Sequence, residues 1–127
     1  MHRKKAHSIK KERSSPGLSG RIWIDGTDGT FLGYGRIVLL EKIRELGSIT
    51  KAAKSMEISY RHAWELVDSM NRQSPKPLVE AATGGRNGGG ARLTKEGEKA
   101  IALFWALYAD FQTYLKVQQK KIKLLWR

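Results

Sequence analysis

The polar run Ser59–His62 contains the side chains best suited to chemistry on another molecule. Ser59 has the position of a helix N-cap, which would make Tyr60, Arg61 and His62 the exposed first turn of a helix. An arginine there can donate two hydrogen bonds to a guanine edge, while tyrosine and histidine can donate to bases or phosphates. The alternative is that Arg61 pairs with Glu65, four residues on, across a solvated helix face. The run thus predicts a DNA-reading turn, with that ion pair as the competing interpretation.

A second polar group precedes this run. Ser48 has the position of an N-cap for an earlier helix, and Thr50, Lys51 and Lys54 occupy its first turn and outer face. Free amides, hydroxyls and ammonium groups at a helix N-terminus suit a phosphate oxygen. Ser48 can cap the helix alone, or cap it and contact phosphate as well. These four residues are candidate DNA-backbone contacts.

The loop from Gly84 to Gly90 has five glycines in seven residues. It lacks the Gly-Lys-Ser/Thr ending of a phosphate-binding P-loop, and it lies between two extended runs, 78–83 and 91–94. We therefore interpret it as the tip of a β-wing, where glycines let the backbone approach a duplex and Arg86 enters a minor groove. Asn87 and Arg92 complete the DNA-binding candidates. The alternative is a flexible turn that becomes ordered only on DNA.

Hydrophobic periodicity identifies the elements that must position these residues. Residues 35–46 predict a helix ended by Gly47 in a left-handed conformation, residues 48–56 a short helix, and residues 59–72 a third helix that Pro75 and Pro77 terminate. The inward faces predicted for the three helices are Ile37, Leu40, Ile43 and Leu46; Ala52, Ala53 and Met56; and Ala63, Leu66, Val67 and Met70. Trp64 is predicted to pack in the core where the helices meet the wing, with stacking on a base as the alternative.

The two ends of the chain differ from this central part. Residues 1–17 read as a disordered basic tail, and residues 18–127 as one domain that opens with a short strand at 21–24, a turn at 25–30 and an extended piece at 31–32. Thr94 can cap a last helix that runs from about 95 to 125. Its apolar face is wide for so small a domain, which predicts burial against a second copy.

The net charge of +12 at pH 7 favours a polyanionic partner, but most of it lies at the two ends. Residues 1–15 and 116–127 each carry a net +5, and residues 48–95 carry eight bases against four acids. The basic ends either attract phosphate or are simply solvated. No apolar run is long enough to span a membrane, and the chain has no cysteine and no catalytic constellation. His62 has only His2 and His7 as histidine companions, both in the tail, so a metal site is not expected. We expect no enzyme activity, no cofactor and no membrane association, and a cytoplasmic location.

At SYRHAW (59–64) and TGGRNGGGARLT (83–94) the chain resembles the N-terminal DNA-binding domain of the molybdate-responsive ModE regulators, whose helix-turn-helix is similar to that of LysR-type regulators. The resemblance extends from about Gly20 to Ala109 and implies a homodimer on a two-fold-symmetric operator. A molybdate-sensing domain follows in full-length members, whereas this sequence ends at Arg127. The resemblance therefore implies DNA binding without molybdate sensing, with an unknown effector or a separate sensor protein left open.

The prediction is thus a mainly α protein with a small β-wing: a winged helix-turn-helix with a long C-terminal dimerisation helix. We expect a sequence-specific regulator of the molybdate-regulator type that binds double-stranded DNA, with repression by promoter occupancy as the simplest output. The alternative is a sequence-indifferent nucleic-acid-binding protein that relies on its basic tails. A third reading, a winged helix that binds only protein, is opposed by Arg61, Arg86 and Arg92.

Overall fold

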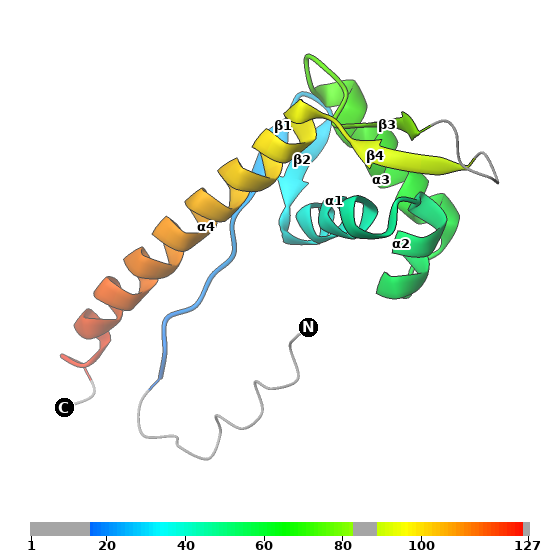
Figure 1. Cartoon of the computed structure of the whole chain (residues 1–127). Helices are drawn as coiled ribbons and strands as arrows, with labels where there is room; N and C mark the ends of the chain where they lie inside the picture. The colour runs from blue at the N-terminus through cyan, green and yellow to red at the C-terminus, as the bar shows by residue number, and fades with distance from the viewer. Residues whose placement is uncertain (1–15, 83–88, 126–127) are drawn as a thin grey trace. The chain divides into compact units, whose positions relative to one another are not determined.

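A computed structural model describes residues 16–82 and 89–125 of the chain. The elements follow the order β1 (Trp23–Gly26), β2 (Gly29–Gly33), α1 (Tyr34–Leu46), α2 (Ile49–Met56), α3 (Tyr60–Gln73), β3 (Val79–Ala82), β4 (Gly90–Leu93) and α4 (Lys95–Ile122) (Figure 1). They divide into two units, which are described separately: residues 22–108, and residues 16–21 together with 109–125. The predicted mainly α architecture with a small β-wing and a long C-terminal helix is confirmed.

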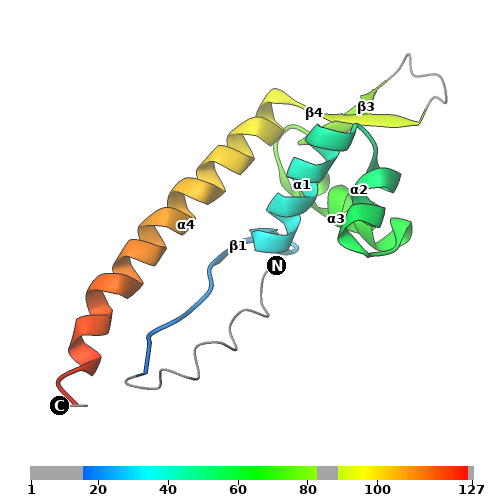
Figure 2. The same ribbon diagram turned by 60° about the horizontal axis from the view of Figure 1, so that its bottom comes forward.

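Helices α1, α2 and α3 form the helix-turn-helix part of the larger unit (Figure 2). Gly47 ends α1 in the left-handed region (φ 71°), and its N–H donates to the carbonyl of Ile43 at 2.8 Å, as a glycine C-cap does. Between α2 and α3 the left-handed residue is Glu57 (φ 58°), a position where a non-glycine side chain is uncommon. The predicted helix limits hold to within one residue at each of these ends.

Strands β3 and β4 pair antiparallel from Val79 opposite Leu93 to Ala82 opposite Gly90. The backbone N–H of Ala91 donates to the carbonyl of Gly47 at 3.0 Å, so the wing is fastened to the corner between α1 and α2. Strand β3 begins one residue later than the predicted run, because Leu78 lies outside the ladder, and β4 is shifted by one residue, from Gly90 to Leu93, because Thr94 lies outside it.

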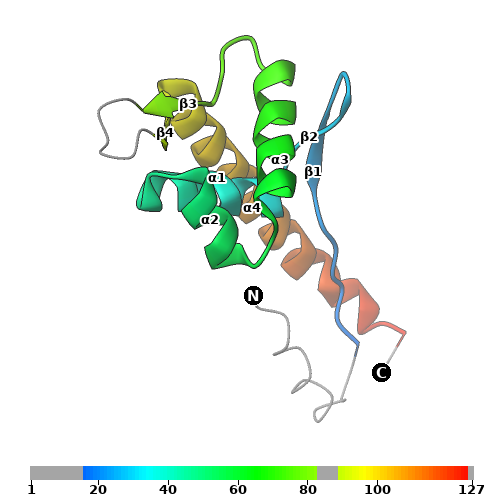
Figure 3. The ribbon, with the colours of Figure 1, turned by 90° about the vertical axis from the view of Figure 1, so that its right-hand side faces the viewer.

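Strands β1 and β2 form a second two-stranded sheet, with a register shift between Ile24 and Asp25 and a turn closed by Gly29 at φ 91°. The first strand begins at Trp23, not at Arg21 as predicted, because Trp23 opposite Gly33 is the first pair of the ladder. Figure 3 shows α3 standing between this sheet and the wing.

The core of the larger unit lies where α1, α2 and α3 meet both sheets and the first turns of α4. Phe104, Leu32, Ile37, Leu40 and Met70 are among its fully buried side chains. Ala52, Ala53 and Ala63 are buried where α2 meets α3, and these small side chains allow the two helices to approach closely. Met56 and Leu66, predicted to face inward, are only half-buried at the edge of this core.

In the smaller unit, residues 16–21 run in an extended conformation along the second half of α4. The N–H of Leu18 donates to the side-chain oxygen of Gln119 at 2.8 Å, and the ring of Phe111 lies against Gly20. The predicted tail at residues 1–15 lies outside the described residues. The last helix ends at Ile122 and continues as a turn through residue 125, close to its predicted end.

Substitution by alanine should have opposite effects on stability at two glycines that lie in helices. A Cβ at Gly97, in the first turn of α4, would overlap the carbonyl oxygen of Leu78, which already accepts from the N–H of Thr94 at 2.9 Å. We expect Gly97→Ala to lower the free energy of unfolding by about 1–3 kcal/mol through overpacking. Gly35, in the first turn of α1, has open space at its Cβ position. Gly35→Ala should raise that free energy by about 0.5 kcal/mol. Urea unfolding of both variants checks this, and equal effects at the two sites would contradict it.

Candidate nucleic-acid interface

The first turn of α2 is built as the sequence predicts. Ser48 has an extended backbone (φ −162°), and its side-chain oxygen accepts a hydrogen bond from the N–H of Lys51 at 3.1 Å. Thr50, Lys51 and Lys54 are exposed on the outer side of the helix. The capping bond uses only an acceptor of the Ser48 hydroxyl, so its O–H can still be donated to another group. Ser48 can therefore cap the helix and contact an anion simultaneously.

The first turn of α3 is also capped and exposed. The side-chain oxygen of Ser59 accepts from the N–H of His62 at 3.0 Å, and Tyr60, Arg61 and His62 are all exposed. Arg61 forms the ion pair with Glu65 that the alternative interpretation expected, with Nε 3.2 Å from Oε2. The arginine side chain nevertheless remains 84% exposed, and exposed i, i+4 pairs of this kind are weak. Arg61 is therefore available to a stronger anionic partner.

The wing carries a second exposed pair of the same kind. Arg92 on β4 lies opposite Glu80 on β3, and its Nε is 2.9 Å from Oε2 of the glutamate. The two predicted wing-tip residues, Arg86 and Asn87, lie outside the described residues. The structure describes two of the predicted DNA-binding arginines, Arg61 and Arg92. In the free protein, each of them is paired with a glutamate.

Two amide side chains near the end of α3, which the sequence analysis did not single out, hold both sheets to this helix. Asn71 accepts from the N–H groups of Leu78 and Val79 at 2.8 and 3.2 Å and donates to the carbonyl of Val79 at 3.0 Å. Gln73 accepts from the N–H of Asp28 and donates to the carbonyl of Thr30, both at 2.9 Å. Periodicity cannot reveal such residues, because their partners lie in other elements.

An arginine reinforces the attachment of the first sheet. Arg72 contacts Asp68 at 2.9 Å and Asp28 at 3.0 Å, and hydrogen bonding to Asp68 and then Asp28 holds the pKa of Arg72 above its ordinary value. Arg36 donates to the carbonyl of Phe31 and to Ser69, and its partial burial lowers its pKa. These two bases are engaged in the fold rather than presented to a partner.

Trp64 corrects one prediction. It lies where the helices meet the wing, as expected, but its side chain is 47% exposed and is not part of the core. The inward face of α3 is occupied by Ala63, Val67 and Met70, which leaves the indole outside the core. A hollow of about 470 Å³ remains between the start of α2, the exposed side of α3 and the wing.

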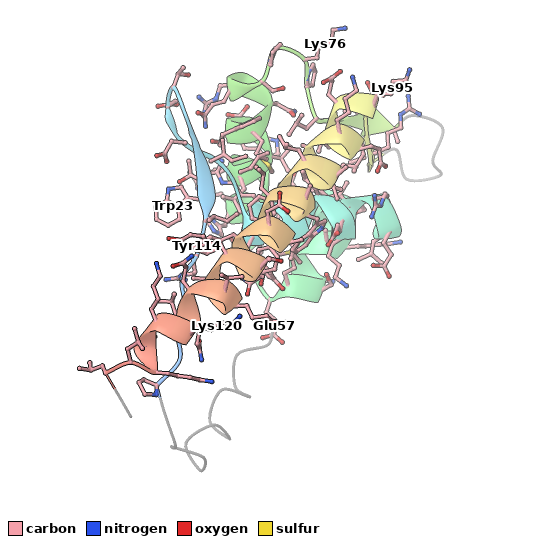
Figure 4. All side chains as sticks on the ribbon, turned by 90° about the vertical axis from the view of Figure 1, so that its left-hand side faces the viewer. Trp23, Glu57, Lys76, Lys95, Tyr114 and Lys120 are labelled. Carbon is pink, nitrogen blue, oxygen red and sulfur yellow. The ribbon has the colours of Figure 1, made fainter. Side chains whose placement is uncertain are left out.

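The basic residues of the central segment do not all lie on one face. Figure 4 shows Lys76 and Lys95 together at the end of the larger unit where α3 leads into the wing and the wing leads into α4. Thr94, beside Lys95, donates to the carbonyl of Pro77 at 2.7 Å, which keeps these loops together. Since α3 has 14 residues and rises about 1.5 Å per residue, this end lies about 20 Å from the first turn of the helix, Tyr60–His62. Only part of the local positive charge accompanies the candidate interface.

Within residues 16–82 and 89–125, no group of three or more histidine, aspartate or glutamate side chains is placed to hold a metal ion. In the same part of the chain, no helix is both long enough and apolar enough to cross a membrane.

Three helices with a capped, exposed first turn on the third, followed by a two-stranded wing, define a winged helix-turn-helix protein. Residues 35–98 match the model of the bacterial regulatory helix-turn-helix proteins of the lysR family. This chain belongs to that family.

Individual relatives agree with this assignment. The chain is 44% identical over 95 residues to the molybdenum transport protein ModE of Azotobacter vinelandii, covering 75% of this chain and 35% of that protein. It is 43% identical over 90 residues to the DNA-binding transcriptional dual regulator ModE of Escherichia coli K12, covering 71% and 32%. The crystal structure of a LysR family transcriptional regulator shares the fold over 68% of this chain and 28% of that one, with a TM-score of 0.53 at 16% identity.

This chain spans about a third of the length of the curated relatives that it matches. The matched family model is one of regulatory helix-turn-helix proteins and the Escherichia coli relative is named a transcriptional regulator, so the predictions of a regulatory helix-turn-helix protein and of the ModE resemblance are confirmed. The roles of the individual DNA-binding candidates remain predictions.

Proposed function

We propose that this protein is a sequence-specific transcription regulator of the molybdate-regulator type, which acts in the cytoplasm as a homodimer on two-fold-symmetric duplex DNA. The observation that carries the proposal is the exposed turn Tyr60–His62, which the side chain of Ser59 caps. The DNA-binding activity named for the Escherichia coli relative supports it. Each subunit places the start of α3 in a major groove.

The neighbouring elements supply contacts to the DNA backbone. Ser48, Thr50, Lys51 and Lys54 present hydroxyl, amide and ammonium donors from α2 to one strand. Arg92, with Arg86 and Asn87 at the predicted wing tip, serves the other side of the reading helix. Tyr60 and His62 donate to bases or phosphates beside Arg61.

An exposed stripe on α4 supplies the surface for the second copy. Its six positions alternate four and three residues apart, four of them are apolar, and all are exposed: Leu103, Leu107, Asp110, Tyr114, Val117 and Lys121. Such alternation is the pattern of a coiled-coil seam.

The two charged positions in the seam indicate an orientation. If two α4 helices pair antiparallel about a two-fold axis, Asp110 of one copy faces Lys121 of the other, and Tyr114 faces Val117. A parallel pairing would instead place Asp110 against Asp110 and Lys121 against Lys121. Charge complementarity therefore favours the antiparallel dimer.

Selection of duplexes from a randomised pool by the purified protein tests the proposal as a whole. At roughly 150 mM salt, where weak electrostatic binding is suppressed, we expect enrichment of a two-fold-symmetric motif. Binding without enrichment, lost as salt rises, would instead support a sequence-indifferent protein driven by its basic tails.

Arg61 should contribute to base recognition. We expect Arg61→Ala to weaken binding to the selected duplex by about 1–3 kcal/mol, with little change on a scrambled duplex, because a bidentate base contact is lost. Lys51→Ala is the matched control, since a phosphate contact should weaken both duplexes alike. Fluorescence anisotropy measures both. Equal losses for Arg61→Ala on the two duplexes would reassign it to phosphate.

Glu65 and Glu80 should restrain non-specific binding. Each glutamate occupies an arginine and adds negative charge beside the duplex, so Glu65→Gln and Glu80→Gln should each raise affinity for scrambled DNA. The slope of log K against log salt should steepen by about one unit per variant. Glu98→Gln removes a comparable exposed partner from Arg44, on α1, and should change neither quantity. Unchanged slopes for the first two variants would contradict the interpretation.

The dimer seam makes a charge-reversal prediction. Asp110→Lys would oppose two lysines across the antiparallel pair and should weaken the dimer about tenfold or more, whereas Asp110→Lys combined with Lys121→Asp should restore it. Sedimentation equilibrium gives the dissociation constants. Failure of the double variant to recover would argue against the antiparallel arrangement, and an unperturbed single variant would remove the seam from the interface.

A further inference from the structure

The hollow beside Trp64 has walls from three separate elements. Thr50 lies at the start of α2, Tyr60 and Trp64 follow one another by one turn on α3, and Val79 and Ala91 belong to the two wing strands. These are the same elements to which the proposed function gives DNA contacts. A duplex strand that leaves the major groove beside α3 and continues toward the wing would therefore pass over this hollow.

The chemistry of the walls is apolar with hydrogen-bond donors at the rim. Val67, Val79 and Ala91 are buried and form the floor, whereas Tyr60 and Trp64 are about half-exposed above it. Within the described part of the chain, neither the Trp64 indole N–H nor the Tyr60 hydroxyl has a hydrogen-bond partner. An indole N–H can only donate, so its natural partner is an acceptor such as a phosphate oxygen.

The one charged side chain that lines the hollow in the described part of the chain, Glu80, has its charge offset by Arg92 at 2.9 Å. Next to the lining residues in sequence, Lys51 follows Thr50 and has no ion pair among the described residues, whereas Arg61 follows Tyr60 and is paired with Glu65. The hollow is partly open to solvent rather than enclosed, so a passing strand can reach it.

We propose that Trp64 and Tyr60 form a seat for one deoxyribose–phosphate segment of the bound duplex. The indole face packs against the sugar, and its N–H, together with the tyrosine hydroxyl, donates to a phosphate. This inference rests on the proposed function and extends it: Trp64 becomes a backbone-binding residue that adds affinity without reading sequence.

Binding of Trp64 variants to the selected duplex and to a scrambled duplex tests the seat. Trp64→Ala should lower affinity for both duplexes by about tenfold, and Trp64→Phe, which keeps a ring and loses the N–H, by a smaller factor on both. Trp23→Ala is the matched control, because Trp23 is also an exposed indole, on β1, and its N–H already donates to Asp25. It should leave both affinities unchanged.

Ethylation interference on the selected duplex identifies the phosphate. With the wild-type protein, ethylation of one phosphate in each half-site should interfere with binding, and with Trp64→Phe that interference should disappear. The melting temperature and circular dichroism spectrum of Trp64→Ala show whether that variant folds. If it does not fold, the interference pattern of Trp64→Phe still tests whether Trp64 contacts the phosphate.

The outcomes separate the two proposals. If the wild-type protein enriches no duplex, the proposed function fails whatever the Trp64 variants do. If the wild type binds its selected duplex and the Trp64 variants bind it equally well, the seat is wrong and the function stands. A loss confined to the selected duplex would make Trp64 a base-contacting residue and overturn the backbone assignment.

Discussion

The attachment of two small sheets to one helix is the constraint on which the larger unit depends. A two-stranded hairpin is marginal in water by itself, so β1–β2 and β3–β4 both need an external anchor. Asn71 and Gln73 provide it, because each primary amide offers a donor and an acceptor that can substitute for a neighbouring strand. The backbone groups of Leu78 and Val79 that Asn71 pairs are buried, and leaving them unpaired would cost about 1–3 kcal/mol each. One helix thereby sets the position of both sheets.

This anchoring leaves the opposite end of the same helix available for recognition. The apolar face of α3 ends in a small Ala63 against α2, and its first turn is stabilised by the Ser59 cap instead of by packing. Tyr60, Arg61 and His62 can therefore remain exposed without loosening the helix. Because Asn71 also attaches the wing to α3, the first turn of α3 and the wing keep their positions relative to each other. The geometry suits rigid recognition of a duplex, in which turn and wing must be presented together.

Local signals explain why much of this arrangement could be predicted from the sequence. The caps at Ser48 and Ser59 and the left-handed Gly47 act within three or four residues, and the alanines facing each other in α2 and α3 follow helical periodicity. Residues whose role depends on a distant partner could not be found in this way. Asn71 and Gln73 are ordinary polar residues near a helix end until the wing and the first hairpin fold against them. Trp64 was predicted to pack in the core where the helices meet the wing, and its exposure depends on how the wing strands fold back beside α3, which helical periodicity does not reveal.

The distribution of charge indicates how attraction and selectivity are divided along the chain. The segments 1–15 and 116–127 carry most of the net charge, whereas the central 100 residues carry only a small excess. Within the central domain, Arg61 and Arg92 are paired with glutamates, Arg72 is engaged with two aspartates, and Lys76 lies at the far end of α3. A domain whose two described interface arginines are already paired with glutamates gains less from each phosphate contact that those arginines make. Its preference for one duplex over another must then come from base contacts, which form only on the correct sequence. Only those contacts compensate for breaking the ion pair between each arginine and its glutamate. In this arrangement the glutamates contribute to selectivity by making non-specific contacts less favourable, without touching a base.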